Sequence, residues 1–212
     1  MVDKPYLPKV MKGFKNRRIP QLRYELEGLY KLMQAENVKS YLEIGLRHAT
    51  TFHWVGSRLP RGTRMTGIDL PGSAWGEKNV DAAREKIAEA SKDLNDIHGQ
   101  DVYILLADSK SDRAVEVAVN RGPFDLIFID GDHSYKGVKA DWETYSPLAR
   151  IVAFHDIDTP NAKWMAEEKK SQFGVHTLWS ELVGTHKHRT FVDPEMPGLG
   201  IGVVWTQKGD AK

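Results

Sequence analysis

The sequence contains no cysteine among its 212 residues. Disulfide bonds, thiolate metal sites and cysteine nucleophiles are therefore excluded. It also lacks a long apolar run: the longest, VYILLA from Val102 to Ala107, is far shorter than the roughly 20 residues that a membrane helix needs. Neither sign of charge dominates, because 30 Lys and Arg face 29 Asp and Glu and the formal charge is +1. We therefore expect no membrane partner and no general attraction to nucleic acid.

The ends of the chain predict location and domain organisation. The amino terminus lacks the apolar segment of a signal peptide, so a cytoplasmic location is expected. Residues 1–19 are rich in Lys and Arg and interrupted by Pro and Gly, which predicts a flexible basic arm, either a solvated terminus or a flap over an anionic ligand. Residues 20–212 are expected to form a single domain, since no interdomain linker is apparent. The oligomeric state stays open, a homo-oligomer included.

From residue 20 onwards, helical and strand-like segments alternate. Apolar residues at helical spacing predict helices starting near Pro20 and over residues 79–94. Short apolar runs read as strands buried on both faces, which predicts an α/β fold: a Rossmann-like, mostly parallel sheet with helices on both faces. Residues 189–193 and 201–206 are joined by a segment rich in Pro and Gly, which predicts a terminal antiparallel hairpin at the sheet edge. The five predicted parallel strands cover residues 41–45, 65–69, 102–108, 124–130 and 150–156.

Polar residues gather where the five predicted parallel strands end. The carboxyl ends of parallel strands share one edge of a sheet, and ligands bind there where the strand order reverses. One acid or histidine at such a position is usually a helix cap or turn former. Five consecutive strand ends of this kind indicate a functional edge instead. The residues are Glu43 and Gly45, then Asp69, Asp108, Asp130, and finally His155 with Asp156.

The first of these turns, EIGLRHATT, favours a nucleoside ligand over a dinucleotide. Gly45 lets the backbone approach a ligand closely. Asp69 follows it at about the number of residues at which, in nucleotide-binding folds, an acid at the end of the second strand binds a ribose diol. The turn is not GxGxxG, and a pyrophosphate normally needs the second glycine. This counts against an NAD-dependent oxidoreductase.

With these motifs in view, the sequence from about Ser40 to Trp205 resembles class I S-adenosylmethionine-dependent methyltransferases. Glu43-Ile44-Gly45 looks like their first motif, Asp69 like the ribose acid, and Asp108-Ser109 like the segment that contacts adenine. The run FDLIFIDGDHSYKGVKADWETYSPLARIVAFHD is similar to small-molecule O-methyltransferases related to macrolide-sugar methyltransferases and cephalosporin hydroxylase-like proteins. The resemblance implies a seven-stranded sheet with a reversed last strand. It also implies S-adenosylmethionine as cofactor, and a small-molecule or sugar hydroxyl as acceptor.

Two features depart from that resemblance or extend it. Ala49 stands where the first turn of the family often has a second glycine, and we expect tighter packing there rather than lost binding. Metal-dependent members hold Mg²⁺ at positions that match Asp130 and the pair His155-Asp156, so these three are candidate metal ligands, with Asp130 also beside the cofactor. Because Mg²⁺ prefers oxygen ligands, His155 weakens the match and favours a softer ion such as Mn²⁺. The alternative is that both carboxylates hold loops only.

The candidate general base is His133. A hydroxyl becomes a nucleophile when a base of near-neutral pKa removes its proton, and histidine has such a pKa without a large shift. In the macrolide-sugar members, the histidine of DGxH has this role, and IDGDH presents His133 in register. His155 is the alternative base. Asp132 either orients His133 or caps the helix that begins near Tyr135, and the sequence does not choose.

Three rival functions use the same residues differently. A metal-dependent hydrolase would use Asp130, Asp132, His133, His155 and Asp156. It would not need Asp69 or Asp108. A non-catalytic nucleoside-binding module, with no turnover, is the second rival. An NAD-dependent oxidoreductase is the third.

Overall fold

The structure is a computed structural model that describes Lys15 and residues 19–206. Most of the predicted basic arm, residues 1–14 and 16–18, lies outside the described residues. Ile19, at the end of that arm, is packed in the core with 2% exposure. Within the described part, no helix combines the length and apolar character needed to cross a membrane.

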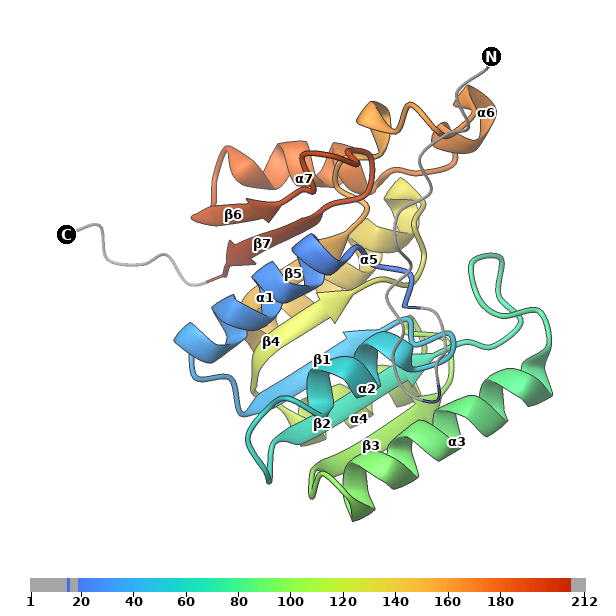
Figure 1. The fold of residues 1–212 in the computed structure, drawn as a ribbon, viewed down its shortest axis with the longest axis vertical. Helices are drawn as coiled ribbons and strands as arrows, with labels where there is room; N and C mark the ends of the chain where they lie inside the picture. Colours follow the sequence, from blue (N-terminus) through green and yellow to red (C-terminus); the bar gives the residue numbers. More distant parts are fainter. Residues whose placement is uncertain (1–14, 16–18, 207–212) are drawn as a thin grey trace.

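A mixed seven-stranded sheet forms the centre of the described residues, in the order β3-β2-β1-β4-β5-β7-β6 (Figure 1). β1 to β5 are parallel, whereas β7 runs antiparallel to both β5 and β6. The predicted fold class and terminal hairpin are therefore confirmed. The strands are β1 (Ser40–Ile44), β2 (Arg64–Asp69), β3 (Asp101–Leu106), β4 (Phe124–Ile129), β5 (Ala149–His155), β6 (His188–Phe191) and β7 (Ile201–Trp205).

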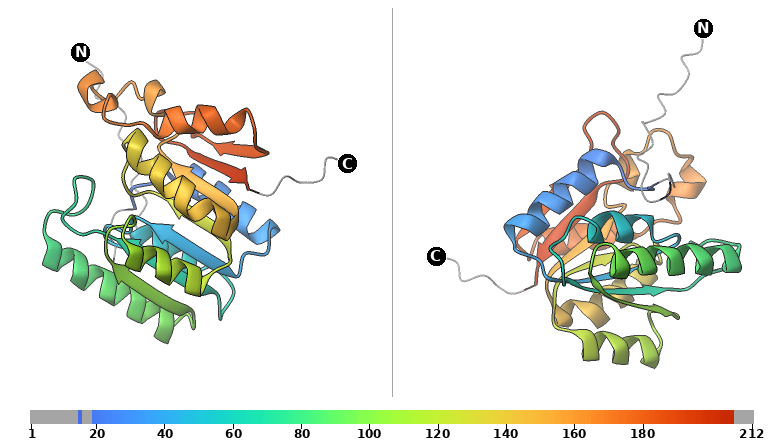
Figure 2. Two further views of the ribbon diagram at one scale, coloured as in Figure 1. Left: turned by 180° about the vertical axis from the view of Figure 1, so that it is seen from behind. Right: turned by 60° about the horizontal axis from the view of Figure 1, so that its bottom comes forward.

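Helices cover both faces of the sheet (Figure 2). One face packs against α1 (Arg23–Ala35), α2 (Thr50–Gly56) and α3 (Val80–Asp96), whose apolar side chains join one core cluster. The other face packs against α4 (Asp112–Arg121), α5 (Tyr135–Tyr145) and α7 (Val175–Val183), which supply a second cluster. The remaining short helices are η2 (Ser146–Leu148), η3 (Thr159–Asn161) and α6 (Glu167–Lys170).

β3 differs from the prediction that all five parallel strands are buried on both faces. It lies at the end of the sheet and pairs only with β2 among the described strands. Its residues are half-buried, and those at its two ends, Asp101 and Leu106, are exposed. An apolar run alone does not distinguish a central strand from an edge strand, because the difference is the presence of a second neighbour.

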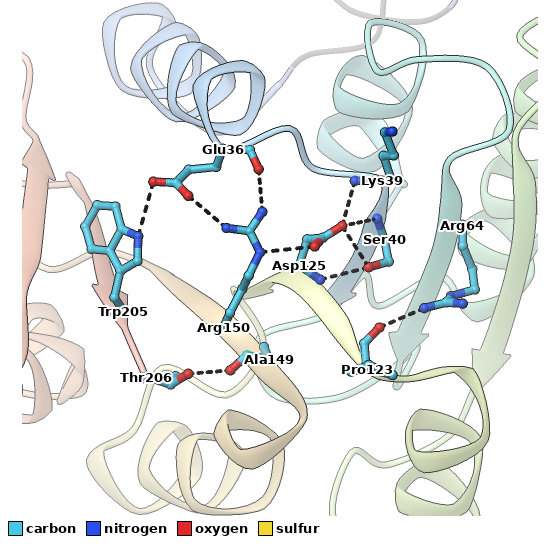
Figure 3. A network of polar contacts seen from close by, with 10 residues as sticks. All are labelled: Glu36, Lys39, Ser40, Arg64, Pro123, Asp125, Ala149, Arg150, Trp205 and Thr206. Carbon is cyan, nitrogen blue, oxygen red and sulfur yellow. Dashed lines mark hydrogen bonds and ion pairs between the residues drawn. The ribbon is translucent and has the colours of Figure 1, made fainter. Parts of the chain in front are cut away.

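An ion-pair cluster joins elements at the amino-terminal edge of the parallel strands (Figure 3). Arg150 at the start of β5 donates from Nε to Asp125 Oδ1 at 3.1 Å and from Nη1 to Glu36 Oε2 at 2.8 Å. Asp125 also accepts from the backbone N–H groups of Lys39 and Ser40. Burial opposes charge on Asp125, but these donors hold the pKa of its carboxyl below the usual range. The cluster ties α1, β1, β4 and β5 together at the edge opposite the strand ends that carry the predicted site.

Candidate active site

The strand order reverses between β1 and β4, and a pocket opens above that point. On one side of this point the sheet continues from β1 to β2 and β3. On the other side it continues from β4 to β5. The pocket has a volume of about 820 Å³, within the range of small-molecule sites. All the predicted site residues line it: Glu43, Gly45, Asp69, Asp108, Ser109, Asp130, His133, His155 and Asp156. The structure therefore brings together every residue that sequence analysis selected.

Gly45 is required by a close approach within the protein. Its φ is +93°, and a Cβ at this position would lie 2.3 Å from the carbonyl oxygen of Asp130. The sequence had suggested approach to a ligand, and the structure adds the end of β4 as the nearer neighbour. Ala49, the N-cap of α2, is fully buried and also has a positive φ of +52°. A glycine would adopt this backbone more easily than alanine does.

Gly45 has both a positive φ and a close backbone neighbour. Replacing it with alanine should therefore lower the free energy of unfolding more than the same change at a glycine that has only a positive φ. Gly45→Ala should lower the free energy of unfolding by about 2 to 5 kcal/mol, because backbone strain and a steric clash add together. Gly62→Ala is the control: Gly62 also has a positive φ, +79°, but a Cβ there would meet nothing within 4 Å. Its cost should be about 1 to 2 kcal/mol, from strain alone. Urea unfolding measures both, and equal costs would contradict the close approach at Gly45.

Asp69, the last residue of β2, holds the first turn with one carboxylate oxygen. Oδ1 accepts from the backbone N–H groups of Leu46 at 2.8 Å and Arg47 at 3.0 Å. Oδ2 is buried and has no hydrogen-bond partner among the described residues. Burial raises the pKa of this carboxyl. An acceptor without a partner, next to the pocket, suits a ligand that brings hydroxyl donors, as a ribose does.

Glu43 lies inside β1 rather than at its end. Its side chain is 1% exposed, and Oε2 accepts from Tyr41 Oη at 2.5 Å. Burial raises the pKa of Glu43 well above its usual range. Asp108 is exposed and forms the turn after β3 by accepting from the backbone N–H of Lys110, while Ser109 Oγ donates to Asp141. Asp108 therefore lines the pocket from an exposed position.

His133 and Asp156 form a dyad at the centre of the site. His133 Nδ1 lies 2.8 Å from Asp156 Oδ2, and its Nε2 lies 3.8 Å from Asp130 Oδ1, beyond hydrogen-bond length. Burial disfavours a charged ring, but the carboxylates of Asp156 and Asp130 outweigh it and raise the pKa of His133. Asp156 has a positive φ of +63°, a conformation that aspartate tolerates better than most residues. Nδ1 is therefore paired with Asp156, Nε2 makes no hydrogen bond among the described residues, and His133 lines the pocket.

Asp132, which the sequence left between two roles, has neither. Its Oδ1 accepts from the N–H and hydroxyl of Ser134, and its Oδ2 pairs with Lys110. Ser134 itself caps α5 by accepting from Gly137 N. Asp156 is therefore the residue that holds His133.

His155, the last residue of β5, lies between the two carboxylates proposed as metal ligands. Its Nδ1 is 3.1 Å from Asp130 Oδ1 and 3.4 Å from Asp156 Oδ1. The ring is 5% exposed, and its Nε2 is buried without a partner in the described part of the chain. Burial opposes its charge, but Asp156 and Asp130 raise the pKa of His155 well above its usual range, while His155 in turn holds the pKa of Asp156 low.

Three residues of the site came from outside the predicted strand ends. Gln21 donates from Nε2 to Asp130 Oδ2 at 2.5 Å, and its Oε1 accepts from Thr51. Phe173 and Trp75 pack on His133, with ring centroids 5.3 and 4.9 Å away. Trp75 has a sequence signal, because its glycine-rich loop directly follows Asp69. For Gln21 and Phe173 the local sequence carries no comparable signal.

Glu25 is a buried acid behind His155. Its Oε1 accepts from Gly200 N at 2.9 Å, just before the β7 residue that pairs with His155, and its exposure is 0%. Burial raises the pKa of Glu25 to about 7. A sequence signal existed: Glu25 falls on the apolar stripe of α1, three residues after Leu22 and four before Leu29.

Comparison with known proteins decides the family. A family described as a methyltransferase domain matches residues 42–157, more than half of the chain. The chain belongs to this methyltransferase domain family. The methyltransferase resembles the O-methyltransferase from Bacillus cereus in complex with SAH, at 21% identity and a TM-score of 0.60, over 87% of this chain and 82% of that chain. TomG, an O-methyltransferase from Streptomyces achromogenes involved in tomaymycin synthesis and solved with SAM, matches at 16% identity and a TM-score of 0.58, over 90% and 83%.

A curated relative matches over a shorter stretch. The uncharacterized protein y4gI of Sinorhizobium fredii is 35% identical over 80 residues, which are 36% of this methyltransferase. The match spans 8% of that relative. Family and fold together confirm the predicted class I S-adenosylmethionine-dependent methyltransferase, and they leave the acceptor, the metal and the individual site residues to the proposals below.

Proposed function

We propose that this methyltransferase transfers the methyl group of S-adenosylmethionine to a hydroxyl of a small molecule, with His133 as general base. The observation that carries the proposal is the His133–Asp156 dyad, both residues of which line the pocket at the switch point of the sheet. S-adenosylmethionine supplies a methyl group on a sulfonium, which needs no further activation. The protein must then align the hydroxyl and take its proton.

The residues around the pocket fit an adenosine ligand. Asp69 offers the unpaired, buried Oδ2 where two ribose hydroxyls can donate, and Gly45 of the first turn lines the same pocket. Asp108 and Ser109 line the same pocket beyond β3 and are proposed to border the adenine. A metal-dependent hydrolase would have no use for the unpaired Asp69 oxygen.

The dyad determines how the proton moves. Asp156 accepts from Nδ1–H of His133, which fixes the tautomer with a lone pair on Nε2. As the hydroxyl oxygen attacks the methyl carbon, the carbon–sulfur bond breaks and the hydroxyl proton passes to Nε2. The resulting imidazolium lies beside Asp156 and 3.8 Å from Asp130, and both carboxylates stabilise its charge. A nucleoside-binding module without turnover would leave this dyad unused.

The rings around His133 favour an acceptor that carries a ring of its own. Trp75 and Phe173 flank His133 and lie 5.0 Å from each other, and both line the pocket. Flat aromatic faces pack well against phenolic rings and against the apolar face of a sugar. We therefore propose phenols and sugars as the acceptor classes to be tested.

A metal ion held by Asp130, His155 and Asp156 does not fit this arrangement. The Nδ1 of His155 lies between the two carboxylates, 3.1 Å from Asp130 Oδ1 and 3.4 Å from Asp156 Oδ1, where a shared ion would have to bind. Its other nitrogen is buried away from them without a described partner. We therefore derive the reaction without a metal.

Removing metal should leave methyl transfer unchanged. We expect equal rates of S-adenosylhomocysteine formation in excess chelator and in added Mg²⁺ or Mn²⁺, measured with a panel of phenolic and sugar acceptors. Loss of activity in chelator and its recovery with Mn²⁺ would contradict the metal-free mechanism. In that case the ligands would be Asp130, His133 and Asp156, whose ligand atoms lie within 4.8 Å of one another.

A further inference from the structure

Three potential metal ligands meet between α2 and α3, on the face of the sheet that α1 also covers. His53 comes from α2, Asp93 from the last turn of α3, and His98 from the segment after α3. One ligand atom of each lies within 4.8 Å of the other two. The three residues are separate from those that line the pocket. Figure 1 shows α2 and α3 side by side on this face.

The distances suit a small four-coordinate ion. His98 Nε2 lies 3.4 Å from Asp93 Oδ2, and His53 Nε2 lies 2.7 Å from the same oxygen. Metal–ligand bonds of about 2.0 to 2.1 Å in a tetrahedral site place neighbouring ligand atoms about 3.3 Å apart. The His98 pair already has this spacing, and the His53 pair needs a shift of about 0.6 Å, which side-chain rotation can supply. The two imidazole rings are in contact, with centroids 5.6 Å apart and ring planes at 85°.

We propose that His53, Asp93 and His98 bind a divalent ion of the Zn²⁺ type. Two imidazoles and one carboxylate are a donor set that Zn²⁺, Co²⁺ and Ni²⁺ accept and that Mg²⁺ does not favour. The side chains of Asp93 and His98 are 25% and 31% exposed, so a fourth position is open to water. His53 is only 8% exposed and anchors the site in the core.

Such an ion would connect the first helix of the cofactor site to the end of α3. α2 begins at Thr50, one turn before His53, and Thr50 lines the pocket. The ion therefore has a stabilising role that is independent of methyl transfer. Without a metal, Asp93 is hydrogen-bonded to His53 and lies 3.4 Å from Nε2 of His98, and the experiment distinguishes this arrangement from a metal site.

Titration with Co²⁺ tests the proposal on the full chain. The visible absorption of Co²⁺ is intense in four-coordinate sites and weak in six-coordinate ones. Asp130→Asn serves as the background, because it disables the other candidate cluster. In this background we expect one equivalent of Co²⁺ with four-coordinate absorption, displaced by Zn²⁺ and not by excess Mg²⁺. The ion should also raise the melting temperature.

Variants of the cluster give the decisive comparison. His98→Ala, at a partly exposed position, should weaken Co²⁺ binding at least ten-fold and abolish the thermal shift, and Asp93→Asn should do the same. His188→Ala removes an exposed histidine of β6 and should change neither. The proposal would be overturned if Asp130→Asn alone and both cluster variants bound Co²⁺ equally, or if only six-coordinate absorption appeared. The three residues would then have a structural role without a metal.

Discussion

Replacing His133 with alanine is expected to lower the rate of methyl transfer by about 10² to 10⁴, the usual contribution of a positioned general base. The affinity for S-adenosylhomocysteine should change little, because the proposed cofactor contacts are at Asp69 and the first turn. Single-turnover rates at saturating cofactor measure the first quantity, and equilibrium binding the second. His188→Ala, on the exposed edge strand, is the control.

The pH profile gives an independent test of the same role. A base must be deprotonated, so the rate should rise with pH through the pKa of His133, which its carboxylate partners raise above the ordinary value of 6.5. Asp156→Asn removes the partner at Nδ1, so the midpoint should move to lower pH and the rate should fall. If His133→Ala keeps the rate and the profile while His155→Ala loses both, the role passes to His155.

The same pKa shift has a consequence for stability. The folded pKa of His133 lies above its unfolded value, so its ion pair with Asp156 stabilises the fold fully below about pH 6.5. That contribution is lost as the pH rises through the folded pKa. The neutral form of His133, which the reaction needs, therefore exists only at a pH where this contribution to the free energy of unfolding is reduced.

Asp69→Asn is expected to weaken binding of S-adenosylhomocysteine by about 10- to 150-fold. This corresponds to about 1.4 to 3 kcal/mol, the contribution of hydrogen bonds to a charged acceptor. The change is selective, because the amide can keep an oxygen at Oδ1, where Leu46 and Arg47 donate, and replaces the unpaired Oδ2 by a donor. The intrinsic tryptophan fluorescence, to which Trp75 and Trp164 of the pocket contribute, provides the titration signal.

A matched control separates this contact from a general change in charge. Asp81→Asn removes the same charge from the first turn of α3, at a side chain that is 96% exposed. It should leave the affinity unchanged. Equal affinities of the wild type and of Asp69→Asn would refute the assignment of Asp69 to the ribose while leaving the base mechanism untouched.

The strands of the sheet could be predicted from the sequence because each buried parallel strand appears as a short apolar run. Each predicted run begins and ends within about two residues of an observed strand, from Ser40–Ile44 to Ile201–Trp205. Once the strands are parallel, their carboxyl ends must share one edge, so the grouping of Asp69, Asp130 and His155 follows from the fold class. The exposed edge position of β3 could not follow, because it depends on which strands become neighbours.

The pairing of side chains within the site was not predictable in the same way. The sequence offered Asp132 as the residue that could orient His133 and Asp156 as a metal ligand, and only the tertiary structure shows that Asp156 holds His133 while Asp132 pairs with Lys110. Gln21 reaches Asp130 from a segment 109 residues earlier. Such contacts depend on side-chain direction, which neither periodicity nor spacing specifies.

Calorimetric titration of the wild-type chain with S-adenosylhomocysteine shows whether the pocket binds the cofactor product. We expect saturable binding of one equivalent, with the same affinity in His133→Ala and a weaker one in Asp69→Asn, because binding and proton transfer use different residues of one pocket. Absence of binding heat up to millimolar ligand, at two temperatures so that a zero enthalpy is not mistaken for no binding, would contradict this expectation.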